Sequence, residues 1–306
     1  MHIPDMMLQG AVCPVTAAIA SFGLAGTAYA AYKTKVKPAA SLFAGVTALI
    51  FAAQMVNFPI PLGTSGHILG ATLAVAILGS TFGITAMSLV VIVQCLVFAD
   101  GGISALGANL LNMALLASLP AVVVREIFNA TPFKKTAYFV AAFVSTLIAA
   151  AACALQLATA GVAPLQSVLS AMLSVHLLIG LAEAGVTVAA LAVLSYAVAQ
   201  VASHRAWMVP LGIAAVTAIV VSPFAATAPD GLETVLGTLG CTCAHGGCLV
   251  HSSSSLFSAP FAAYTVPAVS VEALSTALAG FIGIALLFPI AYSTGRIFAR
   301  YGERSA

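Results

Sequence analysis

The first two residues, Met1 and His2, form a candidate metal chelate at the very start of the chain. A free α-amine, the backbone nitrogen of residue 2 and the imidazole of His2 can close fused chelate rings around one cation. The imidazole of His67 would complete a plane of four nitrogen ligands. Such a plane suits Ni²⁺ or Cu²⁺ and disfavours tetrahedral Zn²⁺. This chemistry requires a free amine on Met1.

His67 follows a stretch that can present an imidazole from a rigid loop. Residues 57–67 read N-F-P-I-P-L-G-T-S-G-H, and their prolines and glycines are expected to interrupt a helix before His67. The hydroxyls of Thr64 and Ser65 are candidates for the outer shell that orients metal ligands. The alternative interpretation is a tight interhelical turn whose histidine is merely interfacial.

The composition predicts an all-α polytopic membrane protein. Hydrophobic residues make up 62% of the chain and charged residues 6%, whereas roughly one quarter of an ordinary soluble domain is charged. The mean hydropathy is +1.13. A spanning helix needs about 20 mostly apolar residues, and breaks divide the chain into about nine such runs. The expected spans are 10–31, 39–57, 67–80, 83–99, 104–124, 136–160, 168–202, 207–225 and 271–295.

The basic residues predict the orientation of these spans. With the N-terminus outside and the C-terminus in the cytoplasm, all ten basic residues fall in cytoplasmic segments, as the positive-inside bias requires. Met1, His2 and His67 then share the extracytoplasmic face with the segment 226–268. The ten are Lys33, Lys35, Lys37, Arg125, Lys134, Lys135, Arg205, Arg296, Arg300 and Arg304.

Two further features of the sequence bear on how the chelate could work. The N-terminus lacks a basic n-region and Asp5 precedes any apolar run, so we expect no signal-peptide cleavage and a retained first span. No glycine is followed by lysine, so the phosphate-binding loop of ATPases is missing. A metal-binding subunit that takes energy from partners, or a stand-alone facilitator, fits both features. No nucleic-acid partner is expected.

Polar residues within the predicted spans have structural and functional interpretations. His176 and Glu183 are seven residues apart and share one helix face. They could orient the ligands through outer-shell hydrogen bonds or tie helices together, and the structural role is favoured. Asn109 and Asn112 are one turn apart and are expected to bond across helices, with lining of the entry to the site as the alternative, and neither is counted as a ligand. Small residues at Ala17, Ser21 and Ala25 permit close approach of a helix, from this chain or from a partner.

A cysteine- and histidine-rich stretch lies in the segment 226–268. Three interpretations remain open for it: an accessory transition-metal site, a disulfide in an oxidising compartment, or an inert insertion. The five side chains concerned are Cys241, Cys243, His245, Cys248 and His251.

Four ordered motifs resemble the CbiM/NikM family over residues 1 to about 200. They are M-H-I-P-D at 1–5, A-A-Q-M-V-N-F-P-I-P-L-G-T-S-G-H-I-L-G at 52–70, A-D-G-G-I-S-A-L-G-A-N-L-L-N-M at 99–113 and V-H-L-L-I-G-L-A-E-A at 175–184. The resemblance implies a seven-helix substrate-specific component of an energy-coupling factor transporter for nickel or cobalt. It also implies metal binding by Met1, His2 and His67, with a transmembrane coupling (T) subunit and two ATPase subunits as partners.

The resemblance departs from the family pattern at Met6. The family usually has glycine after M-H-I-P-D, and this chain has methionine. We expect this difference to affect the geometry of the N-terminal loop rather than metal binding.

A second resemblance covers the C-terminal third. Residues 222–224 (S-P-F), 229–233 (P-D-G-L-E) and 259–261 (A-P-F), followed by Tyr264, Val266 and Pro267, are similar to the PDGLE region of an auxiliary two-helix subunit. The resemblance implies a fusion of a substrate-specific component, residues 1–203, with an auxiliary domain, residues 204–306, that helps to load metal.

The leading hypothesis is the substrate-binding component of a Ni²⁺ importer in a prokaryotic cell membrane, with the ion as cargo and no catalytic cofactor. The same component for Co²⁺ is the nearest alternative. A membrane metalloenzyme or redox protein using the cysteine and histidine loop is the alternative from another class. It is disfavoured because Glu183 and that loop lie at different depths and no nucleophile, base and orienting group occur together.

Overall fold

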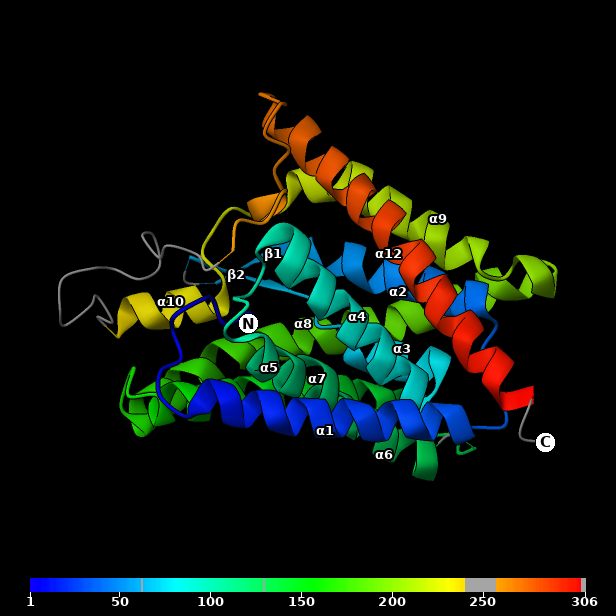
Figure 1. The fold of residues 1–306 in the computed structure, drawn as a ribbon, viewed down its shortest axis with the longest axis horizontal. Coiled ribbons are helices and arrows are strands. Elements are labelled where there is room, and N and C mark those ends of the chain that lie inside the picture. Colours follow the sequence, from blue (N-terminus) through cyan, green and yellow to red (C-terminus); the bar gives the residue numbers. More distant parts are fainter. Residues whose placement is uncertain (62, 129, 240–256, 304–306) are drawn as a thin grey trace.

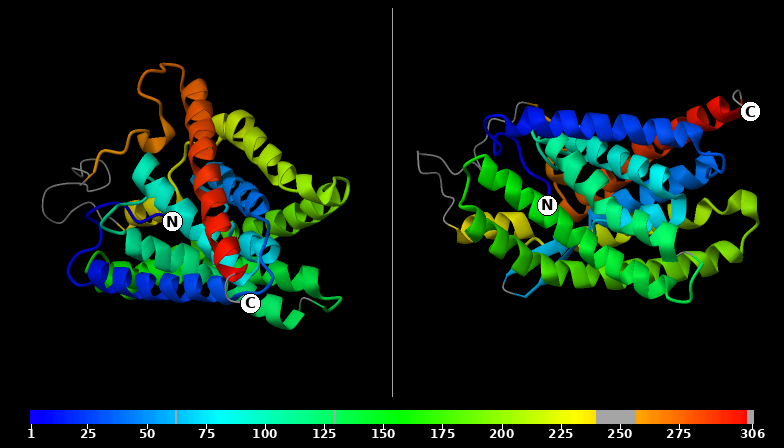
Figure 2. Two further views of the ribbon diagram at one scale, coloured as in Figure 1. Left: turned by 45° about the vertical axis from the view of Figure 1, so that its right-hand side comes forward. Right: turned by 90° about the horizontal axis from the view of Figure 1, so that it is seen from below.

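The computed structural model describes residues 1–61, 63–128, 130–239 and 257–303 and is mostly helical. Most helices run along the longest axis of the molecule (Figure 1). The short helix α10 (Gly231–Thr238) lies toward one end of that axis and the C-terminus lies at the other. The N-terminus is enclosed among the helices rather than extending from them, as the two further views also show (Figure 2).

Within the described ranges, seven helices are long and apolar enough to cross a membrane. This confirms the expected multi-pass helical class. They are Val12–Lys33 (α1), Ser80–Phe98 (α4), Leu106–Phe128, Lys134–Thr159 (α7), Leu165–Ala199 (α8), Ser203–Phe224 and Glu272–Arg300, the last being most of α12 (Glu272–Glu303).

Two of these spans are built from several helical segments. The first comprises α5 (Leu106–Asn109), a π-helical turn (Leu110–Leu115), a 3₁₀ turn (Leu116–Ser118) and α6 (Leu119–Phe128). The second comprises a 3₁₀ turn (Ser203–Arg205), α9 (Met208–Val216), a π-helical turn (Thr217–Val221) and a further 3₁₀ turn (Ser222–Phe224). One more 3₁₀ turn, Ala262–Tyr264, precedes α12.

Two expected spans are shorter than the sequence pattern predicts. The run 39–57 contains the 15-residue α2 (Ala40–Gln54), and the run 67–80 contains the eight-residue α3 (Ala71–Leu78). Between them the chain forms an antiparallel hairpin of β1 (Asn57–Ile60) and β2 (Thr64–His67), in which Asn57 pairs with His67. Gly70, with φ at +80°, marks the start of α3, because few other residues adopt that backbone conformation.

The core of the molecule forms around α2. Every residue from Phe43 to Ala52 is buried there. Helices α9 and α12, from the C-terminal third, pack directly against α2: Gly45 lies under the Trp207 carbonyl and Gly283 lies against the Phe51 ring. Residues on both sides of the predicted boundary at 203–204 therefore share one core.

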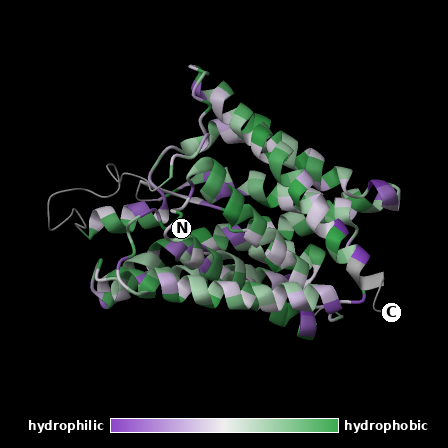
Figure 3. Ribbon diagram, viewed as in Figure 1, coloured by the Kyte–Doolittle hydropathy of each residue, from purple (hydrophilic) through white to green (hydrophobic). Residues whose placement is uncertain are grey.

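The outer surface is apolar along the helices. Helix α1 exposes large hydrophobic side chains such as Phe22, which is 80% exposed, and this suits contact with lipid acyl chains. Hydrophobic residues extend along the helices, whereas hydrophilic residues gather near the N-terminus and at helix ends (Figure 3). Helix α1 ends at Lys33 and α7 begins at Lys134, at the end of the molecule remote from α10.

The chain before α1 turns back into the bundle through residues in the left-handed backbone region. Met6, with φ at +62°, occupies the position at which the resembling family has glycine, and Gly10 has φ at +65°. The Met6 side chain is 45% exposed, so packing contributes little to its place. The left-handed backbone gives the physical reason for glycine at position 6.

We expect Met6→Gly to stabilise the protein slightly. Glycine removes a left-handed penalty of about 1–2 kcal/mol but adds about 0.5–1 kcal/mol of backbone entropy cost, so the gain is at most about 1.5 kcal/mol. Thermal unfolding in detergent should show a rise of roughly 2 °C.

Gly10→Ala is the matched reverse change. A Cβ at Gly10 would meet nothing within 4 Å, so only its left-handed backbone would penalise alanine. This variant should melt at a lower temperature. An unchanged melting temperature in both variants would contradict the backbone argument.

Candidate metal centre

The N-terminal segment of the backbone is held in place by Asn109. Its side-chain oxygen accepts a hydrogen bond from the Ile3 N–H at 2.9 Å, and its side-chain nitrogen donates to the Ile3 carbonyl at 3.0 Å. The Gly102 N–H donates to the same carbonyl at 2.8 Å. Ile3 is fully buried. These bonds fix the backbone one residue after His2 and so fix where Met1 and His2 lie.

The loop after α4 makes room for this segment. A side chain at Gly102 would collide with the Asp5 backbone, so only glycine permits the close approach. Asp5 in turn accepts hydrogen bonds from the Ser104 N–H and hydroxyl, both at 2.9 Å. The motif M-H-I-P-D therefore packs directly against the motif around Asp100 to Asn109, and hydrogen bonds join the two.

His67 is the last residue of β2, and its surroundings fix its ring. Its Nδ1 lies 3.1 Å from the Ile68 carbonyl. Because a carbonyl only accepts hydrogen bonds, Nδ1 carries the proton and Nε2 keeps a free lone pair. The next two backbone N–H groups, of Leu69 and Gly70, donate to Glu183 at 2.7 and 2.9 Å.

Glu183 thus serves the site by holding the backbone that follows His67. Its carboxylate is 1% exposed and lies at the N-terminus of α3, where the helix dipole favours negative charge. Gln54 adds a hydrogen bond from its side-chain nitrogen to the Leu69 carbonyl at 2.6 Å. These contacts join α8 to the backbone after His67, and both interpretations of Glu183, outer-shell support of the ligands and a tie between helices, remain open.

The two ends of the predicted chelate meet. The Met1 amine lies 3.2 Å from His67 Nε2, and the rings of His2 and His67 stack with centroids 5.4 Å apart and planes at 19°. Adjacent ligands in a square plane with metal–nitrogen bonds of about 2.0–2.1 Å are about 2.9 Å apart. The observed separation is close to that value. No described residue accepts a hydrogen bond from the His2 backbone N–H.

Two carboxylates, which the sequence interpretation did not include, hold the same groups. The Met1 amine donates to Asp230 Oδ2 at 3.0 Å, and His2 Nδ1 donates to Asp100 Oδ1 at 2.9 Å. The other nitrogen of the ring, His2 Nε2, is buried without a hydrogen-bond partner. The imidazole must therefore leave Asp100 before Nδ1 can bind a cation.

The charges of these groups depend on one another. Burial lowers the pKa of the Met1 amine, but Asp230 outweighs burial, so that pKa lies above its ordinary value. Burial would raise the pKa of Asp230, yet the Met1 ammonium holds it down to about 2. Burial, together with the ammonium and His2, lowers the pKa of His67 to about 3. At neutral pH the amine is charged and the His67 ring is neutral.

The PDGLE motif has a physical interpretation in this arrangement. Asp230 caps α10, because its Oδ1 accepts from the Glu233 N–H at 2.8 Å while Glu233 accepts from the Asp230 N–H at 3.0 Å. The other oxygen of Asp230 faces Met1. A side chain at Gly231 would lie 2.9 Å from the His176 ring. Asp230 and Glu233 therefore start the helix, and Gly231 lets it lie close to the centre.

Thr64 and Ser65 attach the PDGLE segment to the hairpin. The Ser65 N–H donates to the Pro229 carbonyl at 2.8 Å and its hydroxyl donates to the Ala228 carbonyl at 2.7 Å. The Thr64 hydroxyl donates to the Pro229 carbonyl at 3.1 Å. Their hydrogen bonds go to this segment rather than to the rings of His2 or His67, so any support they give the ligands is indirect.

His176 lies beside the centre. Its Nδ1 donates to the Met172 carbonyl at 2.7 Å, and its ring lines a cavity of about 10 Å³ together with Met1, His67 and Asp230. A space of that size holds about one water molecule. His176 and Glu183 share a helix, but they contact different parts of the site and are not joined by a hydrogen bond to each other.

A second residue of the C-terminal third reaches the centre from the side of His2. The Tyr264 hydroxyl donates to Asp100 Oδ2 at 2.6 Å and accepts from the Gln94 side chain at 3.1 Å. Its ring stacks on Phe98 at 4.8 Å. The His2 imidazole and this hydroxyl hold the pKa of Asp100 well below its ordinary value, although its burial acts in the opposite direction.

Other sequence predictions have different outcomes. Asn112 forms a reciprocal amide pair with Gln156 at 2.8 and 2.7 Å, which is the cross-helix bonding expected of it. Asn109 was expected to do the same and instead clamps Ile3. The sequence feature that could have indicated this role is the position of Asn109 shortly after the Asp100 loop.

The five side chains of the stretch 241–251 lie outside the described residues, so their three interpretations remain open.

Among the described residues no three His, Cys, Asp or Glu side chains form a group suited to a metal ion. The candidate centre therefore depends on main-chain nitrogens. A metal site of this kind is recognised from the free amine and the position of residue 2.

Comparison with known proteins gives matches across the chain. Residues 2–201 match the family model described as the cobalt uptake substrate-specific transmembrane region, CbiM, and residues 204–300 match the PDGLE domain. A putative fused nickel transport protein NikMN of Archaeoglobus fulgidus is 33% identical over 308 residues, covering 97% of this chain and 98% of the relative.

A relative that matches over a shorter stretch and a solved structure agree with these matches. A fused nickel transport protein NikMN of Rhodobacter capsulatus is 37% identical over 129 residues, covering 40% of this chain and 36% of the relative. The crystal structure of a truncated transition metal transporter superposes with a TM-score of 0.58 at 30% identity, covering 64% of this chain and 99% of that one. The chain therefore belongs to the CbiM family, carries a PDGLE domain after its CbiM region, and is a multi-pass membrane component of nickel or cobalt transport rather than an enzyme.

Proposed function

We propose that the chain captures one Ni²⁺ ion at the extracytoplasmic face of a prokaryotic cell membrane. The ligands are the Met1 amine, the backbone nitrogen and Nδ1 of His2, and Nε2 of His67. The observation that carries this proposal is the 3.2 Å separation between the Met1 amine and His67 Nε2, beside the stacked His2 ring. The ion is the cargo, and the ligand set disfavours metals that prefer tetrahedral sites.

Nickel is preferred over cobalt because the ligand set is a plane of four nitrogens, one of them a deprotonated amide. Within a given nitrogen site, affinity rises from Co²⁺ to Ni²⁺. The full-length relative is named for nickel, whereas the matching family model is named for cobalt. Competition between Ni²⁺ and Co²⁺ on the purified protein in detergent decides between the two ions.

The hydrogen bonds of Met1 and His2 suggest how the ion is loaded. Asp230 and Asp100 hold the Met1 ammonium and the His2 ring close to their binding positions. An incoming ion displaces a proton from the amine and another from the His2 amide. The His2 ring turns away from Asp100 and moves its proton from Nδ1 to Nε2. His67 Nε2 has no proton to lose, because the pKa of that ring is about 3.

The C-terminal third is the auxiliary part of the proposed metal-binding protein. We infer a division into residues 1–203, which provide the ligands, and residues 204–306, which provide Asp230 and Tyr264. Asp230 accepts a hydrogen bond from the Met1 amine, and the Tyr264 hydroxyl donates one to Asp100. A segment that bonds the free amine and supports Asp100 is suited to keep the chelate in place until the ion arrives.

Transport requires energy from partners, and we propose a T subunit and two ATPase subunits. Helix α1 supports this proposal, because Ser21 and Ala25 are exposed on its surface. Ala17 is also exposed, although its backbone lies against Gly107. Small side chains of this kind allow the helix of another chain to approach closely in a membrane.

Adding two residues before Met1 should abolish high-affinity Ni²⁺ binding. The Met1 amine is buried, and an extension removes that amine from the centre. The loss should exceed about 100-fold, because even outer-shell changes cost 10- to 100-fold. Titration calorimetry measures it.

Two residues are specified because a single added residue would place the histidine third, where an amine, two amides and the imidazole form a different square chelate. An extension of two residues at the C-terminus is the control and should leave the affinity unchanged. Equal Ni²⁺ affinity in both proteins would refute the role of the amine.

Nickel affinity should fall as the pH decreases. The raised pKa of the Met1 amine means that Ni²⁺ displaces a proton there at neutral pH, and binding releases another from the His2 amide. His67 releases none. Release of about two protons predicts about a 100-fold loss of affinity for each unit decrease in pH below the pKa of the amine. Calorimetry in buffers of different ionisation enthalpy counts these protons.

Asp230→Asn tests the source of this pH dependence. Asparagine caps α10 as well as aspartate does, but it removes the charge that raises the pKa of the amine. The range over which the amine competes with Ni²⁺ should therefore move to lower pH. Asp5→Asn, whose carboxylate bonds Ser104 instead, is the control. A pH profile that is the same in all three proteins would exclude Asp230 from loading.

Uptake should require the motor subunits. Cells that produce this chain without the coupling subunit and ATPases are expected to accumulate no ⁶³Ni above the level of cells producing His67→Ala. Co-production of the motor should restore uptake for the unchanged chain only. Uptake without the motor would instead identify a stand-alone facilitator.

A further inference from the structure

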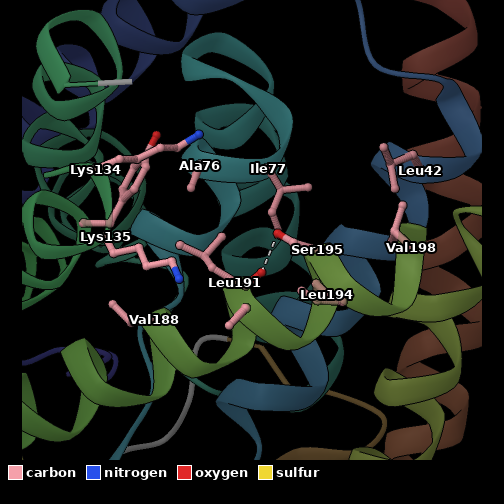
Figure 4. A pocket seen from close by; sticks show the side chains of 12 residues that line it. Leu42, Ala76, Ile77, Lys134, Lys135, Val188, Leu191, Leu194, Ser195 and Val198 are labelled. Atoms are coloured by element: carbon pink, nitrogen blue, oxygen red, sulfur yellow. Dashed lines mark hydrogen bonds between the residues drawn. The ribbon is translucent and has the colours of Figure 1, made fainter. Parts of the chain in front are cut away.

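A second, larger cavity lies far from the candidate metal centre, near the start of α7. It has a volume of about 520 Å³ and is bordered by α2, α3, α7 and α8. Most of its wall is apolar, and the side chains that form this wall are Leu42, Ile77, Val188, Leu191, Leu194 and Val198. The Ser195 hydroxyl bonds the Leu191 carbonyl at 2.6 Å and so presents no unsatisfied group (Figure 4).

Two lysines occupy one side of this cavity. Lys134 and Lys135 extend from the start of α7, Lys134 toward Ala76 and Lys135 toward Leu191 (Figure 4). Both are exposed, and no described acidic side chain forms an ion pair with either of them. Arg125, whose guanidinium donates to the Ala76 carbonyl at 3.4 Å, adds a third positive charge nearby.

A buried hydroxyl lies among these cations. Tyr138 lines the cavity and is 1% exposed, and its hydroxyl forms no hydrogen bond of good geometry, although the Arg125 guanidinium lies close enough to interact with it. The Arg125 guanidinium acts on this hydroxyl electrostatically. A buried polar group without a partner costs free energy, so such groups in native proteins generally mark a missing ligand or a strained site. This hydroxyl can donate to an anion held by the lysines.

We propose that this cavity binds one anionic glycerophospholipid from the leaflet on the basic side of the membrane. Lys134, Lys135 and the Tyr138 hydroxyl hold the phosphate, and an acyl chain lies along the apolar wall of α8. Basic pockets between membrane helices on the cytoplasmic side commonly bind anionic lipid headgroups. The cavity combines a charged rim with an apolar wall, which matches the two parts of such a lipid.

The size of the cavity favours a lipid over a helix of a partner protein. One turn of a helix, about 10 Å across and 5.4 Å long, fills about 400 Å³. The cavity would therefore accept little more than one turn, whereas the headgroup and upper acyl chain of a lipid occupy a space of this order. The proposal does not depend on which metal the chain transports.

The test is titration of phosphatidylglycerol and phosphatidylcholine onto the delipidated full-length protein, followed by native mass spectrometry. One phosphatidylglycerol should bind more tightly than phosphatidylcholine. Lys134→Gln with Lys135→Gln should weaken phosphatidylglycerol binding by about 25-fold, since each lysine near a phosphate contributes a factor of about five. Lys33→Gln with Lys35→Gln removes the same charge elsewhere and should leave binding unchanged.

Tyr138→Phe provides a second, independent measurement. It keeps the buried ring and removes a hydroxyl that forms no hydrogen bond of good geometry, so the melting temperature without lipid should change little. Its affinity for phosphatidylglycerol should fall about 10-fold, as for the loss of a hydrogen bond to a charged group.

Three results would overturn the proposal. Equal weakening in both double lysine variants would mean that the lipid responds only to overall charge. Equal binding of the two lipids would exclude an anion site. Unchanged lipid binding in Lys134→Gln with Lys135→Gln, with loss of co-purification with the ATPase subunits, would assign the cavity to a protein partner.

Discussion

The buried amine of Met1 is the constraint on which the rest of the site depends. An uncompensated charge inside a protein is costly, so the ammonium needs a partner. Asp230 provides it, at 3.0 Å. Because Asp230 also caps α10, the pairing fixes a helix of the C-terminal third against the N-terminus of the chain. The hairpin edge holds the same segment through Ser65, directly before the His67 region.

The two parts of the chain are consequently one structure rather than two attached domains. Helices α9 and α12 complete the core around α2, and the PDGLE segment and Tyr264 complete the polar centre. The amine, His2 and His67 are each held by a hydrogen bond. The bonds of the amine and of His2 would break when an ion binds, and the bond of His67 would remain. Asp230 and Asp100 occupy the groups that change, whereas the Ile68 carbonyl fixes the tautomer of the ring that does not.

Much of this could be predicted from sequence. The long apolar runs predicted the long helices, because a spanning helix must satisfy its backbone internally and remain apolar over about 20 residues. The same reasoning failed at 39–57 and 67–80. There α2 and α3 are short, because the hairpin and Gly70 interrupt the chain, and a hydropathy window averages over such breaks.

The sequence by itself determined the membrane class, and it was enough to propose the short-range chelate of Met1 and His2 with His67, since these depend on composition and on neighbouring atoms. Tertiary structure alone decided which distant groups surround the chelate. Asn109 clamps Ile3, and Asp100 and Asp230 hold His2 and Met1, across separations of about 100 to 229 residues. No local pattern encodes such pairings, because each depends on the positions that whole helices take when they pack together.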